Sequence, residues 1–368
     1  MSTLGKTFIF SLGLALISTW AMGQTVTTPR MSPAAEVTQR IGLTDITVNY
    51  SRPAVINGNN DRTGEVWGNL VPWELSQSGF GNQKPMPWRA GANENTTITF
   101  STDAMVEGKP IAKGTYGLHM IPYENGKVTV IFSNNSTSWG SYWYEEDEDA
   151  LRVDVQSKQC AFTNLLTYAF TSVGTKEGTL SLLWDNKEIP IQLSVGEETI
   201  LQSFRNELRN AAGFGWQGPF SAANYCLNNN VNLEEALTWA DQAITMNKNG
   251  QTMGLKSAIL FKTGNDAEAI KIADEASEVS NENQLNMLGY QMMGVEKYDK
   301  AEEYFKLNIK KNPKSANVYD SMGECYMAMD NSKEAIKMFK KSLATNPPPF
   351  VKTNSIANLK KLGVEVEE

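Results

Sequence analysis

Histidine and cysteine are nearly missing from this 368-residue chain, which holds one histidine, His119, and three cysteines, Cys160, Cys226 and Cys325. A zinc site takes several His or Cys ligands, and neither a C-x-x-C nor an H-E-x-x-H motif occurs. An odd number of cysteines without motif spacing also argues against a disulfide framework. We therefore expect no metal site, and we expect Cys226 and Cys325 to be small buried hydrophobes among helical residues.

Motifs for catalysis and for cofactors are equally scarce. The sequence contains no G-x-S-x-G, no Walker loop and no dinucleotide-binding fingerprint. A Ser-His-Asp triad could use only His119, which alternates within a strand on the face opposite Tyr116, Leu118 and Met120. A structural or solvated role for His119 is favoured over a catalytic one, and no cofactor is expected.

Basic residues are fewer than acidic ones, and the net charge is -8 at pH 7. Nucleic acids and anionic membrane surfaces attract basic proteins, so neither is expected as a general partner. The chain is 41% hydrophobic and 20% charged, which is enough apolar material for real cores.

Long apolar runs are confined to the N-terminus. Lys6 precedes the apolar residues 8–17, and Ala21-Met22-Gly23 places small residues at the two recognition positions of a signal peptidase. We expect residues 1–23 to be a signal peptide and the mature protein, periplasmic or secreted, to begin near Gln24. An uncleaved anchor stays open as an alternative, and no transmembrane segment is expected in the mature chain.

Residues 24–197 have the two-residue period of β-strands. Ile46, Val48 and Tyr50 fall on one face of a strand, and about eight such segments follow one another up to Val195. Turn sequences such as EGKP, ENGK, VGTKEG and DNKE separate the segments, and no amphipathic helix of normal length lies between them. This half is predicted to be an antiparallel β-sandwich or barrel.

Residues 198–368 have a helical period and an internal repeat. Four pairs of identical residues stand 34 positions apart: Gly289 and Gly323, Ala301 and Ala335, Phe305 and Phe339, Pro313 and Pro347. The pattern resembles the tetratricopeptide repeat, in which small residues let two helices approach closely. We predict an all-α solenoid of three helix pairs, with an atypical lead-in pair around Ala222 and a capping helix over residues 354–362.

The stretch PWRAGANENTTITF, residues 87–100, concentrates polar chemistry before a strand. Arg89 and Glu94 could pair and hold a structural corner, in which Gly91 offers a positive φ. Alternatively Trp88 stacks on a polar ligand, Arg89 binds its anion or hydroxyl, and Asn93 and Glu94 orient it. Both interpretations stay open.

Two further sets of residues bear on a site. The aromatic residues of positions 67–144 either pack the long 51–95 connection onto the sandwich or form a sugar-type pocket: Trp67, Trp73, Trp88, Trp139, Tyr142, Trp143 and Tyr144. Residues 59–70 imitate half of a calcium loop, but the twelfth position is Leu70 where a glutamate is needed, so no calcium site is expected.

Several ordered segments resemble the family called domain of unknown function 2911, over residues 30–196. They are residues 32–53, 88–101, 113–122, 130–153 and 180–191. The resemblance implies an exported protein of Bacteroidetes-type bacteria and no particular activity. It also singles out motif positions, and the resulting candidate ligand-binding residues are Arg52, Trp88, Arg89, Asn93, Glu94, His119, Trp139 and Tyr144. The segment VINGNNDRTGEVWG departs from the family pattern beside these motifs.

The first functional hypothesis is a binding protein, with a polar-ligand or glycan site on the β-domain and a helical surface for a protein or peptide. The second is an envelope-associated hydrolase of glycans, in which Glu94 works with a second carboxylate, Asp103 or Glu65. The third is a purely structural envelope component. The pattern leans away from an enzyme.

Overall fold

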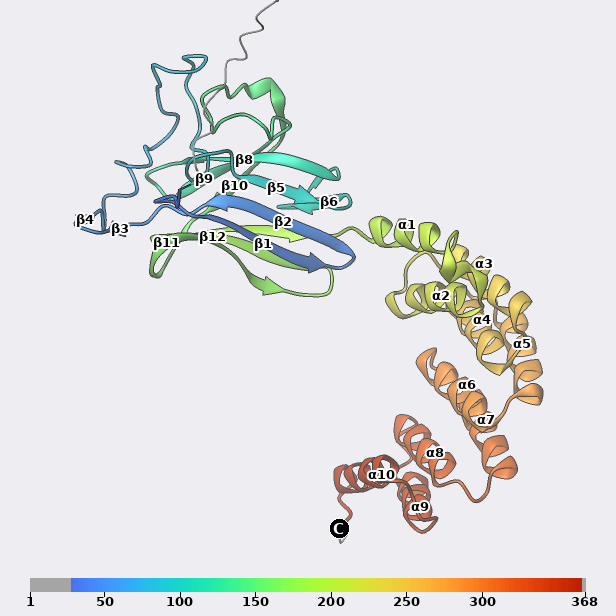
Figure 1. The fold of residues 1–368 in the computed structure, drawn as a ribbon. Coiled ribbons are helices and arrows are strands. Elements are labelled where there is room, and N and C mark those ends of the chain that lie inside the picture. Colours follow the sequence, from blue (N-terminus) through green and yellow to red (C-terminus); the bar gives the residue numbers. More distant parts are fainter. Residues whose placement is uncertain (1–27, 366–368) are drawn as a thin grey trace, which may run out of the picture.

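The computed structural model describes residues 28–365, in which a sheet-rich domain over residues 34–194 precedes a chain of α-helices (Figure 1). This order confirms the predicted fold class. The sheets are open, and no closed barrel is present within residues 28–365. The predicted signal peptide, residues 1–23, lies outside the described residues.

All strand pairs of the β-domain are antiparallel, as predicted. The larger sheet has six strands in the order β1-β2-β5-β8-β9-β10. Their bounds are β1 Ala34–Ile41, β2 Thr44–Ser51, β5 Thr97–Phe100, β8 Gly114–Pro122, β9 Lys127–Ser133 and β10 Asp149–Gln156.

The smaller sheet has four strands in the order β11-β12-β6-β7. Their bounds are β6 Ala104–Val106, β7 Lys109–Ile111, β11 Lys158–Val173 and β12 Glu177–Ser194. A two-residue hairpin, β3 Ile56–Asn57 and β4 Asn60–Asp61, stands apart, and a 3-10 turn, η1, covers Glu146–Glu148.

Alternating side chains of the two sheets enclose one core. Ile46, Val48 and Tyr50 are buried, as their spacing predicts, and they share a cluster with Trp184 of β12. Burial of aliphatic and aromatic side chains is the main stabilising term here, because each such side chain contributes roughly 1.5–3 kcal/mol when fully removed from water.

The predicted turn at DNKE is wrong. Residues on both sides of it belong to the single strand β12, and β11 stays paired across it, with Thr163 opposite Asp185 and Gln159 opposite Lys187. Asp185 has a φ of 55°, and the register of the pair shifts on both sides of it. The extra residues of this irregularity lie in β11, which has three residues between Gln159 and Thr163 where β12 has one between Lys187 and Asp185.

Ten α-helices follow within the described residues. Their bounds are α1 Glu197–Glu207, α2 Gln217–Asn229, α3 Leu233–Met246, α4 Gly250–Lys262, α5 Asp266–Val279, α6 Glu282–Gly294, α7 Tyr298–Lys311, α8 Ala316–Ala328, α9 Ser332–Leu343 and α10 Pro349–Lys361. A 3-10 turn, η2, covers Ala211–Phe214 between α1 and α2. Helices α2 to α9 pack as four consecutive pairs, and α10 packs on α8 and α9 as the predicted capping helix, beginning five residues earlier than expected.

The residues of the 34-position repeat mark the contacts within these pairs. A Cβ atom added to Gly323 would lie 2.6 Å from the ring of Phe339, and one added to Gly289 would lie 2.5 Å from the ring of Phe305. The glycines are needed because the aromatic ring of the second helix occupies the space of their missing side chain.

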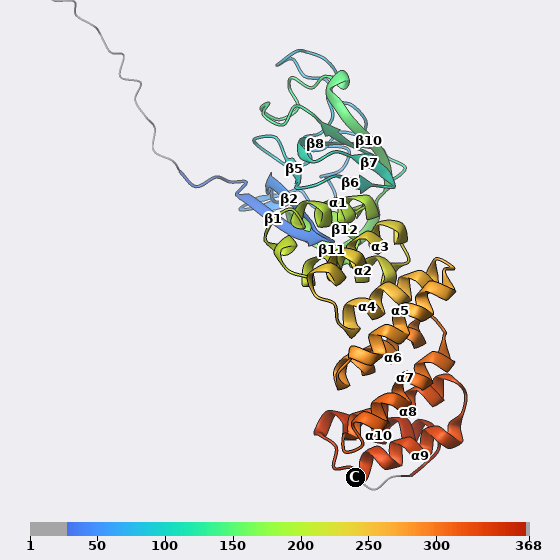
Figure 2. The same cartoon turned by 90° about the vertical axis from the view of Figure 1, so that its right-hand side faces the viewer.

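Helix α1 joins the two parts through a packed junction. Ile200 belongs to the β-domain core, while Phe204 packs against both that core and the first helices of the arm. Lys176 Nζ forms an ion pair with Glu197 Oε2 at 2.6 Å, and the Thr199 hydroxyl donates to the Asp103 carbonyl. The helices then curve away from the sheets as one arm, seen from the side in Figure 2.

We predict that Gly323→Ala lowers the free energy of unfolding of the arm by about 1–3 kcal/mol, because the new methyl group clashes with Phe339 in a packed core. The measurement is chemical denaturation followed by far-UV circular dichroism. Gly294→Ala is the matched control, since Gly294 also lies in a helix and has open space around it. Alanine there should be neutral or stabilising by up to about 1 kcal/mol. Equal effects of the two substitutions would contradict the packing argument.

Candidate functional site

The connection between β2 and β5 lies at the end of the β-domain away from α1 (Figure 1), and it lines a cavity of about 400 Å³. The connection folds back on itself, so that residues near both of its ends line the same space. Arg62, Trp88 and Arg89 come from this connection, Ser141 comes from the segment after β9, and Trp184 comes from β12. The remaining lining residues are apolar or small and polar, among them the five prolines and methionines at positions 31, 53, 72, 86 and 87.

Trp88 fixes the connection to the core. Its backbone exchanges hydrogen bonds with Met120 of β8, at 2.9 and 2.8 Å. Its indole ring stacks on Trp184 with 6.0 Å between ring centroids and 14° between planes, and Trp67 meets both rings edge-on. Such aromatic pairs add about 0.5–1.5 kcal/mol each beyond their buried area, so this wall of the cavity is rigid.

Arg89 is positioned by a cradle of backbone and aromatic groups. Its Nη1 donates to the carbonyl of Asn93, and its guanidinium lies 4.9 Å from the centroid of the Tyr142 ring. A Cβ atom on Gly140, which has a φ of 61°, would lie 2.5 Å from the guanidinium carbon, so only glycine fits beside Arg89.

Arg89 does not pair with Glu94, so the first of the two interpretations of this stretch is wrong in that respect. Glu94 forms its ion pair with Arg30, and its Oε2 accepts from the Ser51 hydroxyl. The chain turns twice between the two residues, because Ala90 and Asn93 have φ values of 50° and 61°. The two charges of the PWRAGANEN stretch therefore have separate partners.

Gly91 also has a different role from the expected one. The left-handed residues of the loop are Ala90 and Asn93, and Gly91 is not among them. Gly91 is buried, and a Cβ atom there would lie 2.5 Å from the hydroxyl of Thr96. The position needs glycine for close packing rather than for its backbone conformation.

His119 lies behind the cavity. Its side chain is 2% exposed, its Nδ1 is 2.9 Å from the Ser141 hydroxyl, and its ring packs against Tyr144 at 5.5 Å. Burial, and after it the positive charge of Arg89, lowers the pKa of His119 to about 4. The imidazole is thus neutral at physiological pH. The structure supports the structural role that the sequence favours.

Two family models match the chain, one in each part. Residues 32–193 match the model described as protein of unknown function (DUF2911), and residues 316–349 match a tetratricopeptide repeat. We call residues 32–193 the DUF2911 domain, after the family model that they match. Both predicted resemblances are confirmed, and the cavity lies within the DUF2911 domain.

Solved structures similar to this chain are TPR-like. One is titled YrrB, a TPR protein with an unusual peptide-binding site, with 17% identity, 44% of this chain and 83% of that chain covered, and a TM-score of 0.28. Another is PilF of Pseudomonas aeruginosa, with 18% identity, 41% and 71% covered, and a TM-score of 0.27. A third is the human IFIT1 dimer with PPP-AAAA, with 19% identity, 45% and 41% covered, and a TM-score of 0.30. No curated protein matches the chain.

The other candidate residues of the DUF2911 domain lie outside the cavity. Arg52 ties the two sheets together, because its Nε donates to the Leu166 carbonyl and its Nη2 to the Thr167 hydroxyl. Asn93 donates to the Ser32 carbonyl. Trp139 is 53% exposed.

Tyr144 is buried in a polar network of its own. Its hydroxyl donates to Asp149 Oδ2 at 2.7 Å and accepts from Arg152. Burial, aided by the negative charge of Asp149, raises the pKa of Tyr144 well above its usual range. Tyr144 therefore acts as a neutral structural hydroxyl in the segment before β10.

Two cavity residues, Arg62 and Trp184, were not among the candidates. Trp184 follows Leu180 and Leu182 at the two-residue spacing of a strand, and this spacing gives no sign that one edge of the ring borders a cavity. Arg62 lies in the stretch that imitates a calcium loop. The Asp61 carboxylate there accepts from the backbone and hydroxyl of Thr63, in a local turn that leaves Arg62 directed to the cavity wall.

The carboxylates of the hydrolase hypothesis are dispersed. The pKa of Glu94 is lowered, first by a hydrogen bond from its own backbone N–H and further by Arg30, so this group is an ionised carboxylate rather than a general acid. Asp103 lies at the α1 junction, where it accepts from the backbone of Lys113, and Glu65 is exposed on a turn. None of the three lines the cavity.

Residues 28–365 contain neither a cluster of metal ligands nor a bilayer-spanning helix. No group of three His, Cys, Asp or Glu residues there is arranged to hold a metal ion. No helix in that range has both the length and the apolar character needed to cross a bilayer.

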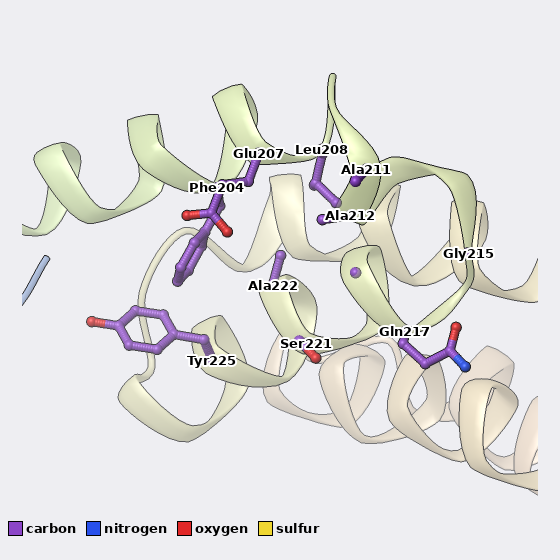
Figure 3. Close-up of a pocket in the computed structure, with 11 residues that line it drawn as sticks. Phe204, Glu207, Leu208, Ala211, Ala212, Gly215, Gln217, Ser221, Ala222 and Tyr225 are labelled. Carbon is purple, nitrogen blue, oxygen red and sulfur yellow. The ribbon is translucent and has the colours of Figure 1, made fainter.

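Two hollows lie in the first part of the helical arm. The first, about 550 Å³, lies between α1, η2 and α2 (Figure 3). The Phe204 and Tyr225 rings stand at one end of it and Gln217 at the other, and Glu207 is its one charged lining residue. The second, about 470 Å³, is lined by α2, by the end of α4 and by α6.

We predict that His119 titrates near pH 4 in the folded protein. The ordinary pKa is 6.5, so as the pH falls the unfolded chain binds the proton first. The stability due to neutral His119 is complete above about pH 6.5 and is lost towards pH 4, about 3 kcal/mol in all. The measurement is an NMR titration of the single imidazole in tag-free protein. Denaturation of His119→Gln from pH 7 to pH 4 is the companion experiment, and a midpoint near 6.5 would contradict the burial argument.

Proposed function

We propose that this chain is an exported binding protein, with a peptide-binding groove on the helical arm and a polar-ligand site on the DUF2911 domain. The tetratricopeptide repeats support the protein-binding role. The observation that carries the proposal is the hollow shared by α2, α4 and α6, because three successive first helices of the pairs contribute to one continuous surface.

The groove has the chemistry of an extended-peptide site. Asn224 and Asn228 lie one turn apart on α2, and an Asn side chain offers a donor and an acceptor, as a peptide backbone does. Met287, 39% exposed, and Tyr290, 36% exposed, supply apolar surface on α6. Lys262 adds one positive charge. We infer that the groove holds an extended segment with an apolar side chain over Met287.

Three observations support the polar-ligand site. The cavity of the DUF2911 domain brings together Trp88 and Arg89, both candidates from the sequence, and adds Arg62. The Trp88–Trp184 stack makes one wall rigid, so a ligand would meet a site that is already formed. The cavity volume falls within the range of small-molecule sites.

Export is supported by the composition of residues 1–23. Lys6, the apolar residues 8–17 and the small residues Ala21 and Gly23 have the order that signal peptidases recognise. The scarcity of cysteine does not oppose export, because the β-domain has a large apolar core of its own.

We expect the mature protein to begin at Gln24 when the chain is expressed in a Gram-negative host and recovered from the periplasm. Intact-mass spectrometry distinguishes a chain that begins at Gln24 from one that begins at Met1. The control is Ala21→Leu with Gly23→Leu, because large residues at the recognition positions should block cleavage. A parent protein that retains residues 1–23 would contradict export by cleavage.

We predict that Met287→Asp weakens peptide binding at least about tenfold, because an aspartate in the groove must be desolvated against an apolar side chain. The probe is a peptide selected on the purified protein from a phage-displayed random library, and its affinity is measured by fluorescence anisotropy.

Ile270→Asp is the matched control for this experiment. Ile270 lies on α5, does not line the groove, and has 38% exposure, nearly equal to that of Met287. Its substitution should leave the affinity unchanged. Selected peptides that bind both variants equally well, or a library that yields no binders, would contradict the groove.

A further inference from the structure

The cavity of the DUF2911 domain is lined by two arginines and by no acidic residue. Arg62 and Arg89 both face this space, and the other lining residues carry no charge. Within residues 28–365 neither guanidinium forms an ion pair with a carboxylate. Eighteen ion pairs occur in the same part of the chain, and arginines 30, 40, 152 and 205 all have carboxylate partners.

The hydrogen bonds of the two arginines leave donors unused. Arg89 uses Nη1 for the Asn93 carbonyl, and Arg62 uses Nη2 for the Ala54 carbonyl. Arg62 Nε is buried without a partner, and so is the indole Nε1 of Trp184 in the adjoining wall. Unpaired buried donors are costly, about 1–3 kcal/mol each, and their persistence at one cavity points to a ligand that supplies acceptors.

We propose that this cavity binds an organic anion, with a carboxylate or phosphate between Arg62 and Arg89 and a flat apolar part against the Trp88–Trp184 wall. Guanidinium groups hold planar carboxylates and phosphates through two parallel N–H donors. Prolines and methionines complete the apolar lining, which suits a compact aromatic or aliphatic body. This inference rests on the proposed polar-ligand site and names its ligand class.

The charge preference follows from the neighbours of the cavity. The carboxylates close to the lining residues in the sequence have partners of their own, since Glu94 pairs with Arg30, Asp61 accepts from Thr63, and Asp185 accepts from Asn186 and from the backbone of Gly64. His119, behind Ser141, is neutral at physiological pH and adds no charge. A neutral sugar could bond to the hydroxyls of Ser76 and Ser141 and to the Asn57 amide, but it would leave both guanidinium charges without a counter-charge.

The test compares benzoate, phenyl phosphate and neutral benzyl alcohol, together with glucose and N-acetylglucosamine, on the full mature chain. Isothermal titration calorimetry gives the affinity. The ring resonances of His119 report the location, because that ring contacts Ser141 in the cavity wall. We expect benzoate or phenyl phosphate to bind at least tenfold more tightly than benzyl alcohol, to shift the His119 resonances, and to bind less tightly as salt is added. The ratio of the two anions identifies the acid group.

Arg62→Gln should weaken anion binding at least tenfold, and Arg209→Gln is the control with the same change in net charge at an exposed position. Arg89→Gln should also weaken anion binding at least tenfold. Arg89 supports the loop as well, so the Arg89→Gln protein could fail to fold, and in that case the result for Arg62→Gln decides the test. Equal binding of neutral and anionic probes, or unchanged binding to Arg62→Gln, would overturn the anion proposal. Binding of the sugars alone would overturn it and leave the polar-ligand site standing. If no probe binds, the anion proposal and the polar-ligand site are both overturned, while the proposed peptide binding by the arm is unaffected.

Discussion

The packing of Trp88 on Trp184 is the contact on which the DUF2911 domain's cavity depends. Strand β12 carries Trp184 into the core, and Trp88 joins the long β2–β5 connection to it by stacking and by two backbone hydrogen bonds to Met120. Without this contact the connection would be a surface loop of more than 40 residues, far longer than a compact domain tolerates without added order. With it, Arg89 follows a fixed backbone position, and Arg62 is brought back towards the same wall.

The two candidate binding regions lie on either side of a packed junction. The β2–β5 connection, which lines the cavity, is on the side of the β-domain away from α1, whereas α2 and α4, which line the groove, belong to the first part of the arm (Figure 1). Ile200 belongs to the β-domain core, and the Lys176–Glu197 ion pair, with both side chains about one-third exposed, adds a modest electrostatic contribution. The apolar packing of Ile200 therefore contributes more than the ion pair to fixing the angle between the β-domain and the arm. A ligand in the cavity and a peptide in the groove would be held at a defined separation.

The periodicity of apolar residues in the sequence predicts those features of the fold that depend only on side-chain packing. The strand faces, the helix pairs and the glycines opposite Phe305 and Phe339 follow from the sequence because each depends on a local spacing and on residue size. The site was harder to predict because it depends on backbone reversals. Ala90 and Asn93 adopt φ values of 50° and 61° and send Glu94 towards Arg30, whereas Gly91, the residue with the freest backbone, is needed for close contact with Thr96. Residues far apart in the sequence, such as Arg62 and Trp184, line one cavity only after the connection folds back, and no short-range sequence pattern indicates this arrangement.

The net charge of this protein is negative, whereas the charge that lines the cavity is positive. A chain with a net charge of -8 repels anions at long range, but exposed charges are screened beyond about 8–10 Å at physiological salt. Inside the cavity the nearest charges are those of Arg62 and Arg89, and the low-polarity walls of tryptophan, proline and methionine screen them less than water would. The global acidity therefore excludes polyanions that need a wide basic surface, and it leaves room for a small anion that enters one pocket. The same argument explains why the pKa of buried His119 responds to Arg89 rather than to the acidic surface.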